Sequence, residues 1–378
     1  MTEPLHEPLR EPLHEPPHEP LHEPLHVRGV RLPDGEHVDL WIRDGHVTYE
    51  PVAGATTIAT GWIVPGLVDM HCHVGLASHG ETDRAATEVQ ALASRDTGVL
   101  LARDCGAPGD TRWIDEREDL PRMVRAGRHI ARPKRYIRDV SVDVEPPELA
   151  ATVAEQVGRG DGWVKIVGDW IDRDAGDMTP LWPVEELRAA IAAAHAGGAR
   201  ATTHVFGRQA LAEALQAGFD CIEHSTGLDD ELTALMASMQ VALVPTLLNV
   251  VDNFPEIAAS GEAKFPAYAA QMRALWADAP ARIATAYEAG VPIYVGTDAG
   301  GVIAHGRIVD EMATLHRAGL PLDYVLGGAS WRAREYLGRP GLAEGDPADL
   351  VVFDADPRLG LATLAAPARI VLRGRVIA

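Results

Sequence analysis

Residues 183–204 read PVEELRAAIAAAHAGGARATTH, and a helix and a strand are predicted to meet within this stretch. Apolar residues recur at the three- and four-residue spacing of an amphipathic helix that begins near Pro183, whose fixed φ suits a first turn. Gly197 follows the last apolar residue, and we expect it to end the helix in the left-handed conformation. The apolar run Ala199–His204 comes directly afterwards and predicts a buried strand.

The same unit of helix, glycine stop and short apolar strand recurs along the middle of the chain, with stops at Gly98, Gly127, Gly218 and Gly290. Strands that alternate with helices predict a parallel sheet with right-handed crossovers, an α/β fold. Eight such units would close a (β/α)8 TIM barrel. An open doubly wound sheet is the alternative, but no GxGxxG turn follows the first strand. The predicted strands are Ile63–Val74, Val99–Gly106, His129–Ile137, Trp163–Val167, Ala199–Val205, Cys221–Ser225, Ala242–Leu248 and Pro292–Asp298.

The two ends of the chain differ from this pattern. Residues 27–60 and 341–378 contain short alternating runs separated by turns, as in hairpins. Neither segment is long enough to enclose a core alone, so we expect the two to form one composite β-sandwich domain beside a barrel at 61–340. Residues 1–26 contain six copies of a proline-bearing tetrapeptide such as Glu-Pro-Leu-His, and predict a disordered arm.

Composition excludes several classes of partner. Lys and Arg total 34 against 55 Asp and Glu, and the net charge of −21 argues against nucleic acid. No uncharged apolar stretch long enough to span a membrane appears, and no basic segment followed by a hydrophobic one begins the chain, so we expect a soluble, cytoplasmic protein. Cys72, Cys105 and Cys221 lack CxxC spacing and lie in predicted strands, which indicates reduced, structural thiols.

His71 and His73 are the first candidates for chemistry. They are two residues apart in the first predicted strand, so both imidazoles point the same way. A His-x-His pair is a weak signal alone, because this chain has 16 histidines. Its position strengthens it, since a barrel places catalytic groups at the carboxyl ends of its strands.

Four more polar residues fall at matching positions on strands four, five, six and eight: Lys165, His204, His224 and Asp298. Each has an ordinary structural explanation, as a snorkelling lysine, a core or capping histidine, or a helix-capping aspartate. Lys165 is nevertheless one of only three lysines in the chain. Repeated placement at one end of one barrel therefore predicts that these residues meet the histidine pair around a metal ion.

These motifs, taken in order, resemble the amidohydrolase superfamily, and the imidazolonepropionase-like and prolidase-like branch most. The resemblance covers about residues 27–378. It rests on Gly61–His73, Val164–Ile166, Thr203–His204, Ile222–His224 and Val295–Gly300, with Gly345–Val352 and Arg373–Val376 similar to the branch's composite β domain.

The resemblance implies a pair of zinc ions, with manganese or cobalt as alternatives. His71, His73 and Asp298 would hold one ion, and His204 and His224 the other. Lys165 would be carboxylated by carbon dioxide and bridge both ions, because a carbamate supplies the anionic oxygens that a dication prefers to an ammonium.

The implied reaction is hydrolysis of an amide-type C–N bond in a small molecule, such as an N-acyl amino acid, a dipeptide or a cyclic amide. A metal-bound hydroxide would attack, and Asp298 would carry the proton to the leaving amine. Lactone or phosphotriester hydrolysis is an alternative. Ring deamination is disfavoured because no acid closely follows His204, and a catalytically silent scaffold is disfavoured because every ligand position is filled. Relatives often assemble, so a homo-oligomer is possible.

The chain departs from the branch after strand three, where Ala131–Tyr136 replaces a Gly-Gly-His run. We predict that Arg135 and Tyr136 contact a substrate carboxylate; a surface charge cluster is the alternative. His305 is predicted either at the pocket rim or as a cap of the following helix, which contains Glu311. The segment Asn249–Tyr268 is predicted to be a long loop that covers the mouth as a lid.

Overall fold

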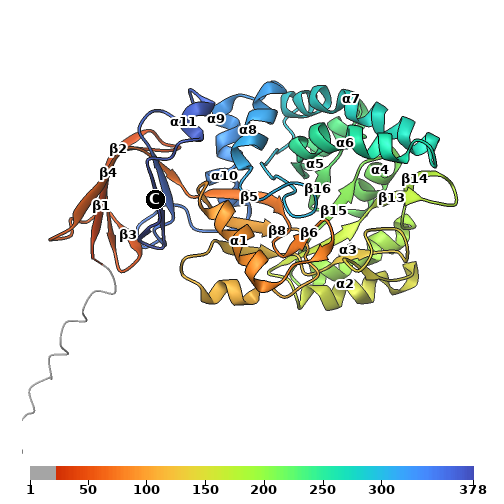
Figure 1. The fold of residues 1–378 in the computed structure, drawn as a ribbon, viewed down its shortest axis with the longest axis horizontal. Helices are drawn as coiled ribbons and strands as arrows, with labels where there is room; N and C mark the ends of the chain where they lie inside the picture. The colour runs from red at the N-terminus through yellow and green to blue at the C-terminus, as the bar shows by residue number, and fades with distance from the viewer. Residues whose placement is uncertain (1–22) are drawn as a thin grey trace, which may run out of the picture.

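The computed structural model describes residues 23–378, which form a barrel surrounded by helices and a sheet domain beside it (Figure 1). Most of the predicted arm lies outside the described residues. The first strand, β1 (Leu25–Arg31), begins two residues before the predicted domain boundary. There the His26 side chain hydrogen-bonds Asp39 and Thr57 of neighbouring strands, so the last repeat ends inside the sheet.

A parallel barrel forms the larger part. Its strands in order are β5 (Leu67–Cys72), β8 (Val99–Asp104), β9 (Arg122–Arg125) with β10 (His129–Ala131), β12 (Trp163–Val167), β15 (Arg200–Val205), β16 (Cys221–His224) and β17 (Ala242–Val244). Residues 292–298 fill the eighth position and close the ring, because Leu243 N donates to Pro292 O and Met70 N donates to Val295 O, each at 2.9 Å. The predicted barrel is confirmed, and the open sheet is excluded.

Three predicted strands have the wrong bounds. The run Ala242–Leu248 ends as a strand at Val244, because Leu247 and Leu248 already belong to α6 (Leu247–Gly261). The run Ile63–Val74 is divided at Gly66: its first residues belong to β4 (Thr56–Pro65) of the sheet domain, and only β5 belongs to the barrel. The third strand begins earlier than His129, because β9 pairs with β8 while β10 pairs with β12. A left-handed Gly127, with φ of +72°, lies between these two pieces.

Helices cover the outside of the barrel (Figure 1). In the unit quoted first, α3 (Val184–Ala196) buries Leu187, Ile191 and Ala194 as predicted. Gly198 takes the left-handed conformation with φ of +76°, whereas Gly197 keeps φ at −84°, so the helix stop is displaced by one residue. The other helices are α1 (Arg84–Arg95), α2 (Leu149–Val157), α4 (Arg208–Ala217), α5 (Asp230–Met239), α8 (Ile308–Arg317), α9 (Leu322–Gly328) and α10 (Trp331–Tyr336).

The predicted lid loop is wrong, because Asn249–Tyr268 is mostly helical. It lies in α6 (Leu247–Gly261) and the start of α7 (Pro266–Glu288). Prolines suggested a loop, but Pro266 occupies the first turn of α7, where its missing N–H costs nothing. In α6 the burial of Val250, Phe254 and other apolar residues compensates for an internal proline.

The predicted composite domain is confirmed as one curled sheet. Its central strand β4 pairs in parallel with β1 and antiparallel with β18 (Leu350–Phe353), so segments from both ends of the chain lie side by side. The sheet curls until β3 (His46–Thr48) meets the C-terminal segment, where Val47 N donates to Asp346 O at 2.8 Å. The remaining strands are β2 (Glu36–Arg43), β19 (Arg369–Leu372) and β20 (Arg375–Val376).

Short elements complete the structure: β6 (Leu76–Ala77), β7 (Gly80–Glu81), β11 (Val142–Asp143), β13 (Asp169–Asp172), β14 (Asp177–Pro180), η1 (Arg112–Glu116), η2 (Pro146–Glu148) and α11 (Leu361–Leu364). Cys72, Cys105 and Cys221 are buried and free. Among residues 23–378, none of the helices is both long enough and apolar enough to cross a membrane.

Candidate metal centre

The barrel brings the six predicted metal ligands to its carboxyl-terminal mouth. His71 lies near the end of β5 and His73 follows it. Lys165 lies in β12, His204 in β15 and His224 at the end of β16, and Asp298 ends the segment that fills the eighth barrel position. Five of these side chains are buried, and that of Asp298 is 15% exposed. Asp298 is therefore the member of the group most open to a substrate.

The first half of the group is His71, His73 and Asp298. The Nε2 atoms of the two histidines are 3.2 Å apart, and Asp298 Oδ1 lies 3.2 Å from His71 Nε2 and 3.0 Å from His73 Nε2. The other ring nitrogens are engaged elsewhere, because His71 Nδ1 donates to Glu223 at 2.6 Å and His73 Nδ1 donates to Gly106 O at 2.7 Å. Those bonds direct both Nε2 atoms toward the carboxylate.

The second half is His204 and His224, whose ring centroids are 4.6 Å apart. His224 also lies 5.1 Å from the His71 ring and hydrogen-bonds Thr246 Oγ1 through Nδ1 at 2.7 Å. Burial lowers the pKa of His224 to about 3 and that of His204 well below its usual value. Both rings are therefore neutral and have a nitrogen lone pair for a cation.

Backbone strain gathers at the same mouth. His224, Ser225, Thr246 and Asp298 all have left-handed backbone, with φ of +64°, +56°, +45° and +57°. Non-glycine residues adopt this conformation at a cost, and least readily when β-branched like Thr246. The packed ends of the sixth, seventh and eighth strands hold these residues in place, which fixes the directions of His224 and Asp298.

Lys165 is buried among these histidines with 1% exposure. Within the described part of the chain, its Nζ has no hydrogen-bond partner. Burial of an unpaired ammonium is costly, so the site requires either an anionic partner or a change in the lysine itself. Carboxylation would provide the change, since it replaces a cation by an anionic oxygen ligand.

A buried ion pair supports the histidines and was not predicted from the sequence. Glu223 bonds His71 Nδ1 through one oxygen and Arg103 Nη2 through the other, each at 2.6 Å. Burial raises the pKa of Glu223, but the Arg103 guanidinium and the neighbouring His71 and Lys165 together outweigh burial and hold the pKa well below the usual range. Glu223 is therefore an ionised carboxylate that fixes the tautomer and direction of His71.

Asp169, at the start of β13, fixes the chain that follows His204. It accepts hydrogen bonds from Phe206 N at 3.0 Å and Gly207 N at 2.6 Å. Burial raises the pKa of Asp169 to about 7. The free energy of unfolding is therefore expected to depend on pH near neutrality through the protonation of Asp169.

Because its folded-state pKa exceeds the unfolded value, the contribution of Asp169 to stability is complete below about pH 4 and is lost as pH rises through about 7. We expect the free energy of unfolding of the wild type, relative to Asp169→Asn, to fall by more than about 1 kcal/mol between pH 4 and pH 8. Urea unfolding across that range measures the difference. A constant difference would contradict the assignment.

Asn249 and Asn253 on α6 form a second unpredicted support. Asn249 Nδ2 donates to Asp298 Oδ2, and Asn253 Nδ2 donates to Asn249 Oδ1 at 2.6 Å. These residues are four positions apart, which places both amides on one face of a helix. They were not predicted because this segment was expected to be a loop. Asn249 therefore holds Oδ2 of Asp298, and Asn253 holds the Asn249 amide in turn.

The three predicted substrate contacts lie in different surroundings. The Tyr136 ring is partly buried beside the centre, 4.8 Å from Trp170 and 5.9 Å from His204. The Arg135 guanidinium turns to the β13–β14 hairpin instead and donates to Trp170 O and Thr179 O at 3.0 Å. His305 approaches α1, with Nδ1 at 3.2 Å from Ser94 Oγ.

His129 is a further member of the site that the sequence analysis did not single out. It is fully buried in β10, its ring centroid is 5.0 Å from His73, and its register partner on β12 is Lys165. Burial and the neighbouring His73 lower its pKa well below the usual value. In the sequence, a single histidine at the start of a short strand does not indicate that its side chain lies beside the metal centre.

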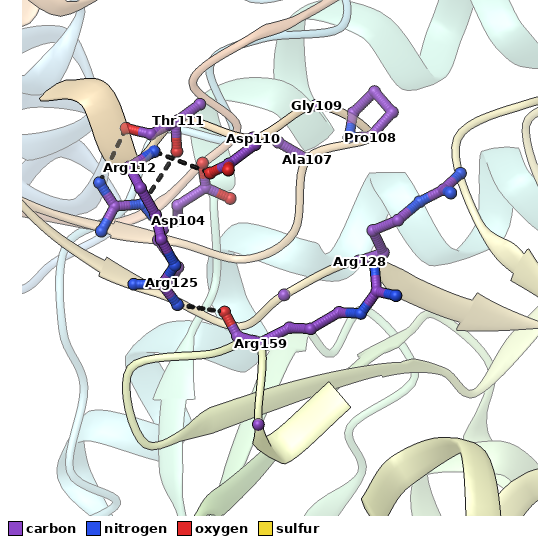
Figure 2. Close-up of a pocket in the computed structure, with 12 residues that line it drawn as sticks. Asp104, Ala107, Pro108, Gly109, Asp110, Thr111, Arg112, Arg125, Arg128 and Arg159 are labelled. Carbon is purple, nitrogen blue, oxygen red and sulfur yellow. Dashed lines mark hydrogen bonds between the residues drawn. The ribbon is translucent and has the colours of Figure 1, made fainter. Parts of the chain in front are cut away.

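A cavity of about 330 Å³ beside the barrel is lined by Arg112, Arg125, Arg128 and Arg159 (Figure 2). Figure 2 shows that Arg125 is bonded to Thr111 and Arg112 to Arg159 O. None of the six predicted metal ligands lines it. Asp104 connects this cavity to the site. Its carboxylate accepts hydrogen bonds from Val74 N and Gly106 N, and so holds the segments that contain His73 and Gly106, the hydrogen-bond partner of His73.

Comparison with known proteins gives three informative relatives. An uncharacterized Mycobacterium tuberculosis protein is 56% identical over 351 residues, which cover 92% of this chain and 94% of that protein. Ochratoxinase of Aspergillus niger is 26% identical over 219 residues, covering 56% of this chain and 44% of the enzyme. The crystal structure of a putative prolidase from Bifidobacterium longum superposes with a TM-score of 0.77 at 24% identity, covering 94% of each chain.

The model of the Amidohydrolase family matches residues 62–377, which include the whole barrel and all six predicted ligands. This match extends over most of the chain, and the superposition on the prolidase agrees with the barrel and its β-sandwich. The chain therefore belongs to the amidohydrolase family.

Proposed function

We propose that this chain is a metal-dependent amidohydrolase that cleaves an amide-type C–N bond of a small molecule, such as an N-acyl amino acid, a dipeptide or a cyclic amide. One observation carries the proposal: the Nε2 atoms of His71 and His73 and Oδ1 of Asp298 lie within 3.2 Å of one another at the barrel mouth. The match to a relative named ochratoxinase supports an enzyme rather than a scaffold.

The donor set fits divalent metal ions. His71, His73 and Asp298 would hold one zinc ion and His204 and His224 a second, and a carboxylated Lys165 would contribute anionic oxygens to both. Neutral imidazoles and carboxylate oxygens suit zinc, and manganese or cobalt would accept the same donors. Among residues 23–378, Lys165 Nζ and His204 Nε2 have no hydrogen-bond partner, which supports this assignment because a cation site leaves ligand atoms without protein partners. Such ions lower the pKa of a coordinated water and polarise a carbonyl group.

Asp298 moves the proton in this mechanism. Burial raises the pKa of Asp298, but the neighbouring His71, His73 and His224 together outweigh burial and keep the pKa well below the usual value, so the side chain is ionised and its oxygens are free to accept a proton. It takes a proton from the attacking water as the oxygen–carbon bond forms. When the C–N bond breaks, it gives that proton to the leaving nitrogen. Asn249 holds Oδ2 in position throughout.

Aromatic side chains form the neighbouring wall. Trp170 lies 5.3 Å from the His204 ring, Phe206 lies 4.3 Å from it, and Phe254 of α6 packs on Phe206 at 4.7 Å. We propose that this wall and Tyr136 receive an apolar group of the substrate. Arg135 would act through the hairpin, by holding the Trp170 carbonyl.

A substrate panel tests the reaction class. We expect purified protein reconstituted with zinc, manganese or cobalt to hydrolyse the best amide with kcat/KM at least about tenfold above the best lactone or phosphotriester, a difference of about 1.4 kcal/mol in transition-state binding. Asp298→Asn serves as the background control. Faster hydrolysis of a lactone or phosphotriester, or release of ammonia from a heterocycle, would overturn amide hydrolysis. Protein that binds no metal and acts on nothing would indicate a scaffold.

A further inference from the structure

His129 occupies a position that none of the proposed metal ligands explains. Its side chain is fully buried, and among residues 23–378 neither ring nitrogen has a hydrogen-bond partner. A neutral imidazole offers one N–H donor and one acceptor, and leaving both unmet inside a protein costs free energy. A phenylalanine would fill the same volume without that cost. The nitrogens therefore indicate a partner that the protein atoms alone do not supply.

The surroundings of His129 identify the side on which that partner lies. Its ring is 5.0 Å from His73 and 5.1 Å from Tyr136. On the Nδ1 edge is Gly106, with φ of +120°, where an added Cβ would come within 2.9 Å of His129 Nδ1. The lack of a side chain at Gly106 thus makes room for the imidazole, and the Nδ1 edge is occupied by backbone.

Strand register supplies the second observation. β10 and β12 are parallel neighbours, and His129 is the direct partner of Lys165. Paired residues on adjacent strands project to the same face, within reach of each other's long side chains. Lys165 Nζ, on this neighbouring strand, is also a buried polar atom for which the described residues provide no partner. Two neighbouring groups without partners point to one missing group between them.

We propose that His129 is a positioning residue that donates a hydrogen bond from its imidazole N–H to the carboxylate carried by Lys165, and so stabilises the carboxylated lysine. This inference rests on the carboxylation of Lys165 in the proposed function. In that reaction the Lys165 amine attacks the carbon of CO₂ and an N–C bond forms. One C=O electron pair becomes the carboxylate charge, and the amine releases a proton to solvent. A donor at His129 slows the reverse loss of CO₂, because hydrogen bonds to a charged acceptor are strong.

The full chain, reconstituted with zinc and [13C]bicarbonate, gives a direct measurement. NMR detects the carbamate carbon on Lys165 as a resonance that is absent from the Lys165→Ala variant. The matched pair is His129→Phe, which keeps the ring volume without nitrogens, and His129→Gln, which keeps an N–H donor. Circular dichroism and thermal unfolding establish that each variant folds; His129→Leu replaces His129→Phe if the latter does not.

We expect His129→Phe to require at least about tenfold more bicarbonate than wild type for half-maximal carbamate, as for loss of a hydrogen bond to a charged group. His129→Gln should stay within about threefold. Unchanged carbamate in His129→Phe, or metal loss without carbamate loss, would overturn the role of His129. Absence of the resonance from wild type would overturn the carboxylation as well. If wild type shows the resonance but cleaves no compound of the panel, the proposed reaction is wrong, but the carbamate measurement still tests the role of His129.

Discussion

Replacing Asp298 with Asn is expected to lower kcat on the best amide by about 10²–10⁴-fold, the range for loss of a positioned general acid–base group. The amide is isosteric and keeps one oxygen 3.0–3.2 Å from the two histidine nitrogens, so most bound metal should remain. It has no carboxylate oxygen to accept a proton from water. Steady-state kinetics and metal analysis by mass spectrometry on the same preparation measure both effects.

Asp252→Asn on α6 is the matched control. Its side chain is 46% exposed and lies near Arg307, away from the six ligands, so we expect wild-type kcat. Should Asp298→Asn retain more than about a tenth of the wild-type kcat, proton transfer through Asp298 would be wrong. Loss of all metal in that variant would instead make Asp298 primarily a ligand.

Lys165→Ala is expected to lose one of two bound metal ions and to lower kcat by at least about 10²-fold, the scale associated with disrupted metal sites. The change removes the shared anionic oxygens and leaves a cavity where the buried side chain lay, among His71, His129, His204 and His224. Metal stoichiometry per chain is the primary measurement. Added formate or acetate should restore part of the second ion's occupancy, since a small carboxylate can occupy the cavity.

Lys264→Ala, an exposed lysine stacked on Phe265, controls for the loss of a positive charge and should keep both ions. Full metal content and full rate in Lys165→Ala would show that the site holds a single ion without a carboxylated lysine. The paired readouts distinguish that result from simple unfolding, which would abolish both metal binding and the cooperative thermal transition.

Much of the barrel could be predicted because helix and strand patterns repeat locally. The stretch 183–204 contains its own helix face, stop and strand, and the structure reproduces each within a residue or two. The bounds of strand three could not be predicted, because Gly127 interrupts the strand. Its two pieces, β9 and β10, share one position in the barrel only because β9 pairs with β8 and β10 pairs with β12. Pairing between distant strands is not visible in local periodicity.

The site was predictable only where residues carry a family motif. His71, His73 and Asp298 stand in recognisable runs, and the barrel brings them together. Glu223 lies inside one of these runs, but its role depends on Arg103, 120 residues away in sequence. His129 belongs to none of the runs, and its role depends on neighbours in other strands. Asn249 was missed for another reason: the loop prediction removed the helix that directs its amide to Asp298.

The pairing of β4 with β18 has a consequence for synthesis on the ribosome. β4 is complete when residue 65 has been made, but its antiparallel partner is residues 350–353, near the other end of the chain. Throughout elongation the apolar residues Ile63 and Val64 therefore present an open strand edge, a surface that recruits other chains. The edge is covered only after residues 350–353 have been made, so a nascent chain arrested before residue 350 keeps this edge open and is exposed to aggregation.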